Sequence, residues 1–148
     1  MDALALTLIF AFFVVASLLT RLWLDARQGR HVAQHQHAVP EAFARDVSLD
    51  SHQRAARYTL DKLRFGLVSA TVSTAVLIGW TLLGGLGLLN VVVREWTLDS
   101  WGPMAYQLAL FGAFMLVSGL IDLPLEAWNT FRIEQRHGFN RMGWGMWL

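Results

Sequence analysis

Two histidines of this chain have a spacing that zinc enzymes use. His31 and His35 are four residues apart, so a helix would carry both imidazoles on one face. The zinc-binding sequence H-E-x-x-H also needs a glutamate directly after the first histidine, where it acts as general base, and this chain has Val32 there. Because His37 follows closely, we interpret the stretch as a histidine-rich polar loop rather than as a metal site.

Two carboxylates form a second candidate. Asp122 and Glu126 lie one helical turn apart at the end of a long apolar stretch. Paired carboxylates near a membrane can bind a cation or exchange a proton, so a component of a transport pathway is one hypothesis. The interpretation that we favour is that they end the apolar stretch and pair with Arg132 or Arg136.

The rest of the sequence offers no familiar reactive group. The chain has no cysteine, which excludes thiol nucleophiles, disulfides and thiolate metal sites. It has no G-x-S-x-G, P-loop, dinucleotide-binding or EF-hand sequence. A formal net charge of +1 is too small to favour a nucleic-acid partner. Spacing alone therefore assigns no residue to catalysis or to a metal.

The composition is that of an integral membrane protein. Of the 148 residues, 55% are apolar and 16% are charged, against about 45–50% and about 25% in soluble proteins. The apolar residues form three blocks, which cover 3–20, 66–93 and 100–121. A helix of about 20 residues crosses a hydrocarbon layer of about 30 Å. We therefore predict an all-α membrane fold with three transmembrane helices, at about 3–24, 66–93 and 100–123.

The positive charges predict the orientation in the lipid bilayer. Eight of the 12 lysines and arginines lie between Arg21 and Arg64, three follow the third block, and only Arg94 lies between the second and third. By the positive-inside rule the N-terminus faces out, and the loop 25–65 and the C-terminal segment face the cytoplasm. The preference for arginine over lysine favours a bacterial inner membrane over the endoplasmic reticulum.

Local signals refine the cytoplasmic loop. Pro40 breaks it, and Asp50-Ser51 form an N-cap pair before a helix predicted over 52–65. Arg57 and Asp61, four residues apart, would support that helix by pairing. We expect it to continue directly into the second span.

Glycines and prolines predict where the spans begin and end. The glycine-dense stretch 79–87 marks the end of the second helix, an interpretation that we favour over a kink facing a cavity. Pro103 lies near the first turn of the third span, and Pro124 ends that span because it has no backbone N–H to donate.

The segment 123–141 carries a distinctive sequence, LPLEAWNTFRIEQRHGFNR. It resembles the signature of CAAX prenyl proteases of the a-factor-converting type, in which LP and an aromatic residue precede F-x-I-E-x-x-x-G-F-N and a basic or polar residue. The matching residues are Pro124, Phe131, Ile133, Glu134, Gly138, Phe139 and Asn140. Tyr58, Lys62 and Phe65 similarly resemble the helix that enters the family's second span.

The resemblance implies that residues 1–148 form one N-terminal membrane region, with a juxtamembrane signature at 124–142. The whole protein would be a seven-helix zinc metalloendopeptidase that encloses a large chamber. The family holds its zinc on an H-E-x-x-H helix and a later glutamate, and it cleaves prenylated C-a-a-X polypeptides or other membrane polypeptides. This chain has no H-E-x-x-H, so we predict that it binds no zinc and, as an N-terminal fragment or a truncated product, is inactive alone.

The signature residues are expected to brace the chamber wall. Gly138 permits a positive φ, Asn140 can bond backbone groups in a turn, and Phe139 would anchor that turn. Glu134 is expected to reach toward the chamber or to pair with a nearby arginine: Arg132, Arg136 or Arg141. The alternative is a non-catalytic three-span scaffold or partner-binding protein.

Overall fold

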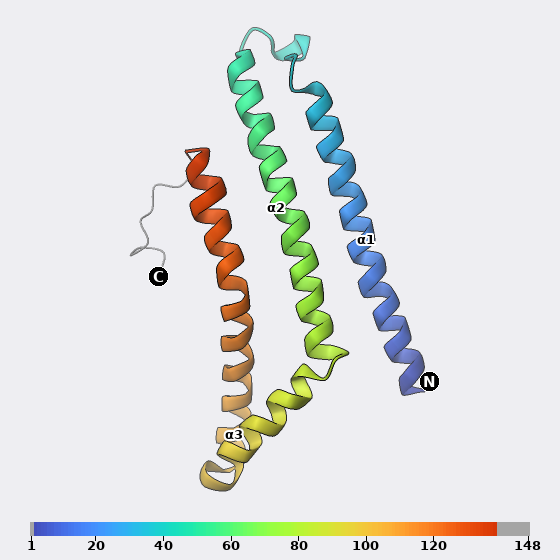
Figure 1. The fold of residues 1–148 in the computed structure, drawn as a ribbon, viewed down its shortest axis with the longest axis vertical. Helices are drawn as coiled ribbons and strands as arrows, with labels where there is room; N and C mark the ends of the chain where they lie inside the picture. Colours follow the sequence, from blue (N-terminus) through green and yellow to red (C-terminus); the bar gives the residue numbers. More distant parts are fainter. Residues whose placement is uncertain (1, 139–148) are drawn as a thin grey trace. The chain divides into compact units, whose positions relative to one another are not determined.

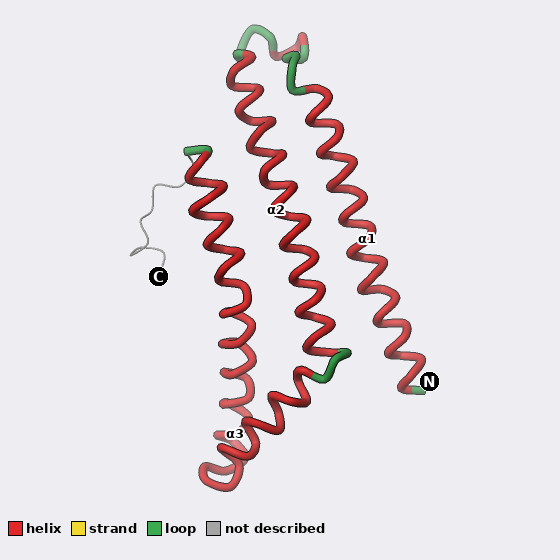
Figure 2. The backbone as a smooth tube through the Cα atoms, viewed as in Figure 1, coloured by secondary structure: helices red, strands yellow, loops and turns green. Residues whose placement is uncertain are grey.

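The computed structural model describes residues 2–138, and this part of the chain contains helices and turns but no strand (Figures 1 and 2). Its elements are α1 (Ala3–His35), the 3₁₀ turn η1 (Glu41–Phe43), α2 (Leu49–Thr81), α3 (Gly85–Trp128) and the π-helical turn η2 (Asn129–Glu134). Three helical segments are long and apolar enough to cross a membrane: Ala3–His35, Leu49–Thr81 and Trp101–Glu134. The predicted all-α fold with three spans is confirmed.

Large apolar side chains cover the outside of these helices. Leu4 is 71% exposed, Phe12 67% and Leu108 67%. In the described residues only four apolar residues are buried: Ala56, Ala70, Val93 and Ile133. An exposed apolar surface of this extent needs hydrocarbon around it, so it fits a chain whose medium is lipid.

The loop predicted at 25–65 is mostly helical. The first helix continues through His35, past the charged residues expected to end it, and α2 begins at Leu49. Only residues 36–48, with Pro40 at the start of η1, connect the two helices. The difference has a physical reason, because charge ends the hydrocarbon-crossing part of a helix without disfavouring the helix itself.

α1 packs against the first part of α2 at two glycines. A Cβ at Gly29 would lie 3.7 Å from Leu63 Cδ1, and one at Gly66 would lie 3.9 Å from Asp25 Oδ2. Both distances are ordinary van der Waals contacts, so the two helices lie side by side at these glycines and a methyl group would still fit there.

The start of α2 differs from the predicted N-cap pair. Ser48 is the cap, since its Oγ accepts a hydrogen bond from the Ser51 backbone N–H at 3.2 Å. Asp50 lies inside the first turn and pairs with Arg54 at 3.2 Å. The predicted pair of Arg57 with Asp61 is not formed in the described part of the chain. The helix does run unbroken into the second span, as predicted.

The second apolar block is not one helix. α2 ends at Thr81, and Gly84 takes a φ of +82° before α3 begins at Gly85. A Cβ at Gly85 would lie 2.7 Å from the Gly79 carbonyl oxygen, so the chain turns here through space that only glycine leaves open. The glycine-dense stretch therefore ends a helix as expected, whereas the single span predicted over 66–93 is wrong.

The two prolines of α3 act differently. Gly102, with φ +80° and ψ +175°, breaks the helix, and Pro103 lies at the start of the next helical segment, as predicted. Pro124 does not end that segment, which continues to Trp128 and into η2. A proline costs a helix one backbone hydrogen bond, but membrane helices tolerate it because breaking the helix in lipid would free more polar groups.

The chain forms two compact units. One contains the described residues up to Thr71 together with those from Ala127 on, and the other is Val72–Glu126. The second unit contains a hydrogen bond from the Tyr106 hydroxyl to Asn90 and an edge contact between the Trp80 and Phe114 rings.

Candidate functional site

Lys62 on α2 forms hydrogen bonds to two side chains of the turn η2. Its ammonium donates to Asn129 Oδ1 at 2.8 Å and to Glu134 Oε1 at 3.0 Å. Asn129 Nδ2 donates to the same Glu134 oxygen at 3.2 Å, so the three side chains form a closed triangle. The Lys62 and Glu134 side chains are about one third exposed, which leaves the ion pair partly shielded from solvent.

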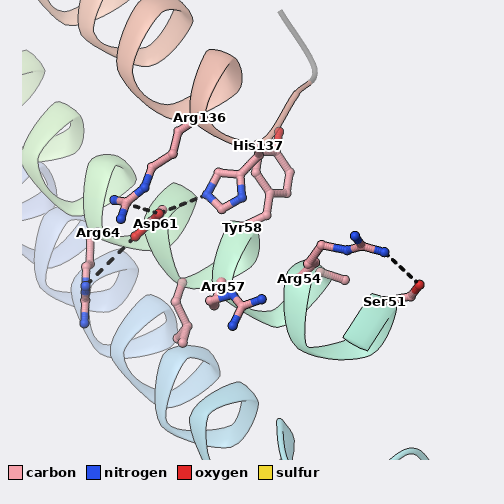
Figure 3. A pocket seen from close by; sticks show the side chains of 10 residues that line it. Ser51, Arg54, Arg57, Tyr58, Asp61, Arg64, Arg136 and His137 are labelled. Atoms are coloured by element: carbon pink, nitrogen blue, oxygen red, sulfur yellow. Dashed lines mark hydrogen bonds and ion pairs between the residues drawn. The ribbon is translucent and has the colours of Figure 1, made fainter. Parts of the chain in front are cut away.

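A second group lies beside the triangle. Asp61 Oδ2 lies 3.0 Å from His137 Nε2 and 4.0 Å from Arg136, and Asp61 Oδ1 lies 4.0 Å from Arg64 (Figure 3). The Tyr58 ring meets the His137 ring edge-on, with centroids 5.2 Å apart. We call the five linked residues Asp61, Lys62, Asn129, Glu134 and His137 the juxtamembrane cluster.

The turn η2 positions these side chains. It is a six-residue π-helical stretch, and such wide turns interrupt the regular rotation of an α-helix. Thr130 and Ile133 are each only 7% exposed, so they form the packed side of the turn. Asn129 and Glu134, at its two ends, are thereby both brought to Lys62.

The cluster joins the two segments whose sequences resembled one family. Lys62 belongs to the stretch 58–65, and Glu134 belongs to the signature 124–142. Among the described residues Glu134 pairs with Lys62 on another helix and not with Arg132 or Arg136, whereas Arg141 lies outside the described residues. Residues two positions away along a helix do not face each other, whereas Lys62 lies across the helix contact.

One sequence signal pointed to Lys62. It is the single lysine in a chain whose other cationic residues, apart from histidine, are arginines. An ammonium can donate three hydrogen bonds in different directions, which suits two acceptors held at an angle, whereas guanidinium donors lie in one plane.

The other candidates lie away from this cluster. His31 and His35 are on α1, with ring centroids 4.3 Å apart, and His35 Nδ1 lies 2.8 Å from the His31 carbonyl oxygen. Asp122 and Glu126 are exposed on α3. Gly138 has a φ of +79°, as expected, whereas Phe139 and Asn140 lie outside the described residues. Pro124 and Phe131 lie in α3 and η2.

No metal centre is formed by the part of the chain that the structure describes. Between residues 2 and 138, no three histidine, aspartate or glutamate side chains converge as metal ligands. A zinc ion needs at least three protein ligands in a catalytic site. The described residues do not fit a zinc ion, and no chemical step through a metal is assigned to them.

The family is shown by comparison with known proteins. The family model of the CAAX prenyl protease N-terminal region, described as five membrane helices, matches residues 28–148. The human CAAX prenyl protease 1 homolog is 31% identical over 152 residues, which cover 95% of this chain and 31% of that protein. The homolog from Oryza sativa is 27% identical, over 92% of this chain and 32% of that protein. The chain thus belongs to the CAAX prenyl protease N-terminal family.

The fold agrees with a solved structure. The crystal structure of S. mikatae Ste24p aligns with a TM-score of 0.86 at 20% sequence identity, over 95% of this chain and 33% of that one. The chain therefore spans about a third of the length of the relatives that it matches. It is a multi-pass membrane protein, and its plant, mammalian and yeast relatives do not favour the bacterial membrane expected above.

Proposed function

We propose that this chain is the N-terminal membrane region of a zinc metalloendopeptidase that cleaves prenylated or membrane-associated polypeptides. The observation that carries this proposal is the triangle of Lys62, Asn129 and Glu134, which joins the two segments that resemble the proteases. The family membership of residues 28–148 and the names of the relatives, all CAAX prenyl proteases, support it.

In this proposal the chain builds a wall and performs no bond cleavage. The juxtamembrane cluster holds the signature segment against α2, and Ile133 and Thr130 pack beneath it. A zinc ion would be held by residues other than those described here. The residues Pro124, Phe131, Ile133, Glu134, Gly138, Phe139 and Asn140 then act by fixing the shape of a chamber.

The test compares this chain with the protein that the gene encodes in cells. Both are purified in detergent, and their zinc content and their hydrolysis of a farnesylated C-a-a-X peptide are measured. We expect the 148 residues alone to bind no zinc and to leave the peptide intact. If the gene continues in frame into H-E-x-x-H, the longer protein should bind one zinc and cleave the peptide.

A positioning variant sharpens the test. Glu134→Gln in the longer protein removes the ion pair with Lys62, so we expect cleavage to fall while the zinc content stays unchanged. Lys62→Arg keeps the charge but not the directions of the ammonium's hydrogen bonds, so it should retain only part of the activity. If the protein from cells holds no zinc and cleaves no farnesylated peptide, the proposal is wrong, and a three-span scaffold would be the remaining function.

Orientation and cellular location belong to the same proposal. The N-terminus faces outward and the arginine-rich loop faces the cytoplasm, and arginine usage favours a bacterial inner membrane. Single cysteines introduced at Asp2 and Arg45, labelled with a membrane-impermeant maleimide in intact cells, test the orientation. We expect labelling at position 2 and none at position 45.

A further inference from the structure

Two hollows adjoin each other where α2 changes from charged to apolar. The first, which we call the basic hollow, has a volume of about 760 Å³, and its charged lining includes Arg54, Arg57, Arg64, Arg136 and Asp61. The second, the apolar hollow, has a volume of about 260 Å³, and its walls include Phe65, Val68, Trp128 and Ile133. Asp61, Arg64 and Arg136 line both hollows, so the two adjoin each other at these side chains.

The basic hollow carries excess positive charge. Four arginines and one carboxylate, Asp61, line it. Asp50 lies outside the lining and pairs with Arg54, so two positive charges remain in excess. Arg57 makes no ion pair or hydrogen bond with any described residue, and Figure 3 shows it on the same stretch of α2 as Arg54 and Asp61. Arginines favour phosphate because the guanidinium can donate two parallel hydrogen bonds to it.

The apolar hollow lies at the depth expected for the start of a lipid chain. On α2 the last charged residue is Arg64, and from Phe65 to Thr81 the helix carries no charge. Trp128 lines the same hollow, and tryptophan is enriched at the level of lipid headgroups. An anionic group held by the arginines would therefore lie at the membrane surface, with apolar walls directly beneath it.

We infer that the two hollows together bind one anionic phospholipid. Its phosphate contacts the basic hollow through Arg57 and Arg136, and the first part of one acyl chain lies against Phe65, Val68 and Trp128. The charge complementarity of the first hollow and the apolar walls of the second select this ligand over a soluble anion, which would leave the apolar walls empty. The inference depends only on membrane insertion, so it stands or falls separately from the protease proposal.

Lipid retention tests this site directly. The purified protein in neutral detergent is titrated with dioleoyl phosphatidylglycerol or dioleoyl phosphatidylcholine, and bound lipid is counted by native mass spectrometry. We expect one phosphatidylglycerol to be retained, with an affinity about tenfold higher than that for phosphatidylcholine, since each nearby arginine contributes on the order of fivefold or more. Equal retention of the two lipids would overturn the inference.

Matched variants distinguish a specific lipid site from a general electrostatic attraction between the basic protein surface and anionic lipid. Arg57→Gln removes a side chain without a partner in the described part of the chain, so the fold should be kept, and we expect phosphatidylglycerol affinity to fall about fivefold. Arg57→Lys keeps the charge but not the two parallel hydrogen bonds, so the affinity should lie between those of the unchanged protein and Arg57→Gln. Arg45→Gln removes the same charge from a residue that lines neither hollow, and it should leave affinity unchanged. A similar loss in Arg45→Gln would show nonspecific attraction and contradict the site.

Two further measurements identify the ligand class. Val68→Ser makes the apolar wall polar and should weaken phosphatidylglycerol retention severalfold. Inorganic phosphate and glycerophosphoglycerol should compete only at concentrations far above that of the lipid. If either soluble anion competes as well as the lipid, or if a farnesylated peptide with a free carboxylate binds at the hollows while phosphatidylglycerol does not, the lipid assignment is wrong.

Discussion

The two ends of the third span are held in different ways. In the juxtamembrane cluster, charged and polar side chains join residues between 67 and 76 positions apart in the sequence. In Val72–Glu126, a hydrogen bond joins the side chains of Tyr106 and Asn90, which are only 16 positions apart. Apolar contact gives little net attraction between helices surrounded by lipid. Charged and polar side chains thus connect distant parts of the chain at one end, whereas contacts over short sequence distances shape the other.

The largest effect should come from breaking the charged end. Lys62→Met leaves Glu134 without its cation and Asn129 without a donor, so we expect a loss of about 2–3 kcal/mol in the free energy of unfolding. Circular dichroism during a titration with sodium dodecyl sulfate measures it. Arg57→Met is the matched control, since it also replaces a cation of α2. A loss below about 0.5 kcal/mol would make the pair an ordinary surface ion pair.

The packed side of η2 should come next. Ile133→Ala removes a side chain that is 7% exposed, so we expect a loss of about 2 kcal/mol in the same titration. Leu108→Ala, at a position that is 67% exposed in Val72–Glu126, should change stability by less than about 0.5 kcal/mol. An equal loss of stability in Ile133→Ala and Leu108→Ala would contradict the proposed difference in packing between the two regions.

The break at Gly102 should have a smaller effect. Its φ of +80° and ψ of +175° belong to a region that other residues rarely adopt, so Gly102→Ala should cost about 1–2 kcal/mol. Gly112→Ala, within the helical part of α3 and with nothing within 4 Å of the added Cβ, should instead be neutral or slightly stabilising. Thermal unfolding followed by circular dichroism compares the two, and a stabilising Gly102→Ala would contradict the break.

The smallest effect should come from the Tyr106 hydrogen bond. Tyr106→Phe removes only the hydroxyl that donates to Asn90, and hydrogen bonds between membrane helices contribute about 0.6 kcal/mol on average. A double-mutant cycle with Asn90→Leu isolates that contribution. A coupling above about 2 kcal/mol would mean that this region, too, is held mainly by polar contacts.

The sequence was sufficient for the all-α fold and the lipid medium, and insufficient for several helix ends and for the contacts between helices. Apolar block length predicts a span because the bilayer thickness is fixed, and the glycine-dense stretch correctly predicted the end of α2. The helix end predicted at Pro124 was wrong. The hydrogen bond that proline removes costs less free energy than opening a helix in lipid would. The partner of Glu134 was also not predicted. Arg132 and Arg136 are near it in the sequence, whereas Lys62 comes near it only when the chain folds. The family resemblance included both the stretch 58–65 and the signature 124–142, but it did not predict the contact between them.

The wide turn at Asn129–Glu134 also changes the direction in which the side chains after it point around the helix axis. Each residue of an α-helix advances the chain by about 100° around the axis, so one extra residue in a turn rotates everything that follows by about that angle. Residues 135–138 therefore face a direction that a regular continuation of α3 would not give them. Deleting one residue from this turn would leave the composition almost unchanged and yet turn Arg136 and His137 away from Asp61.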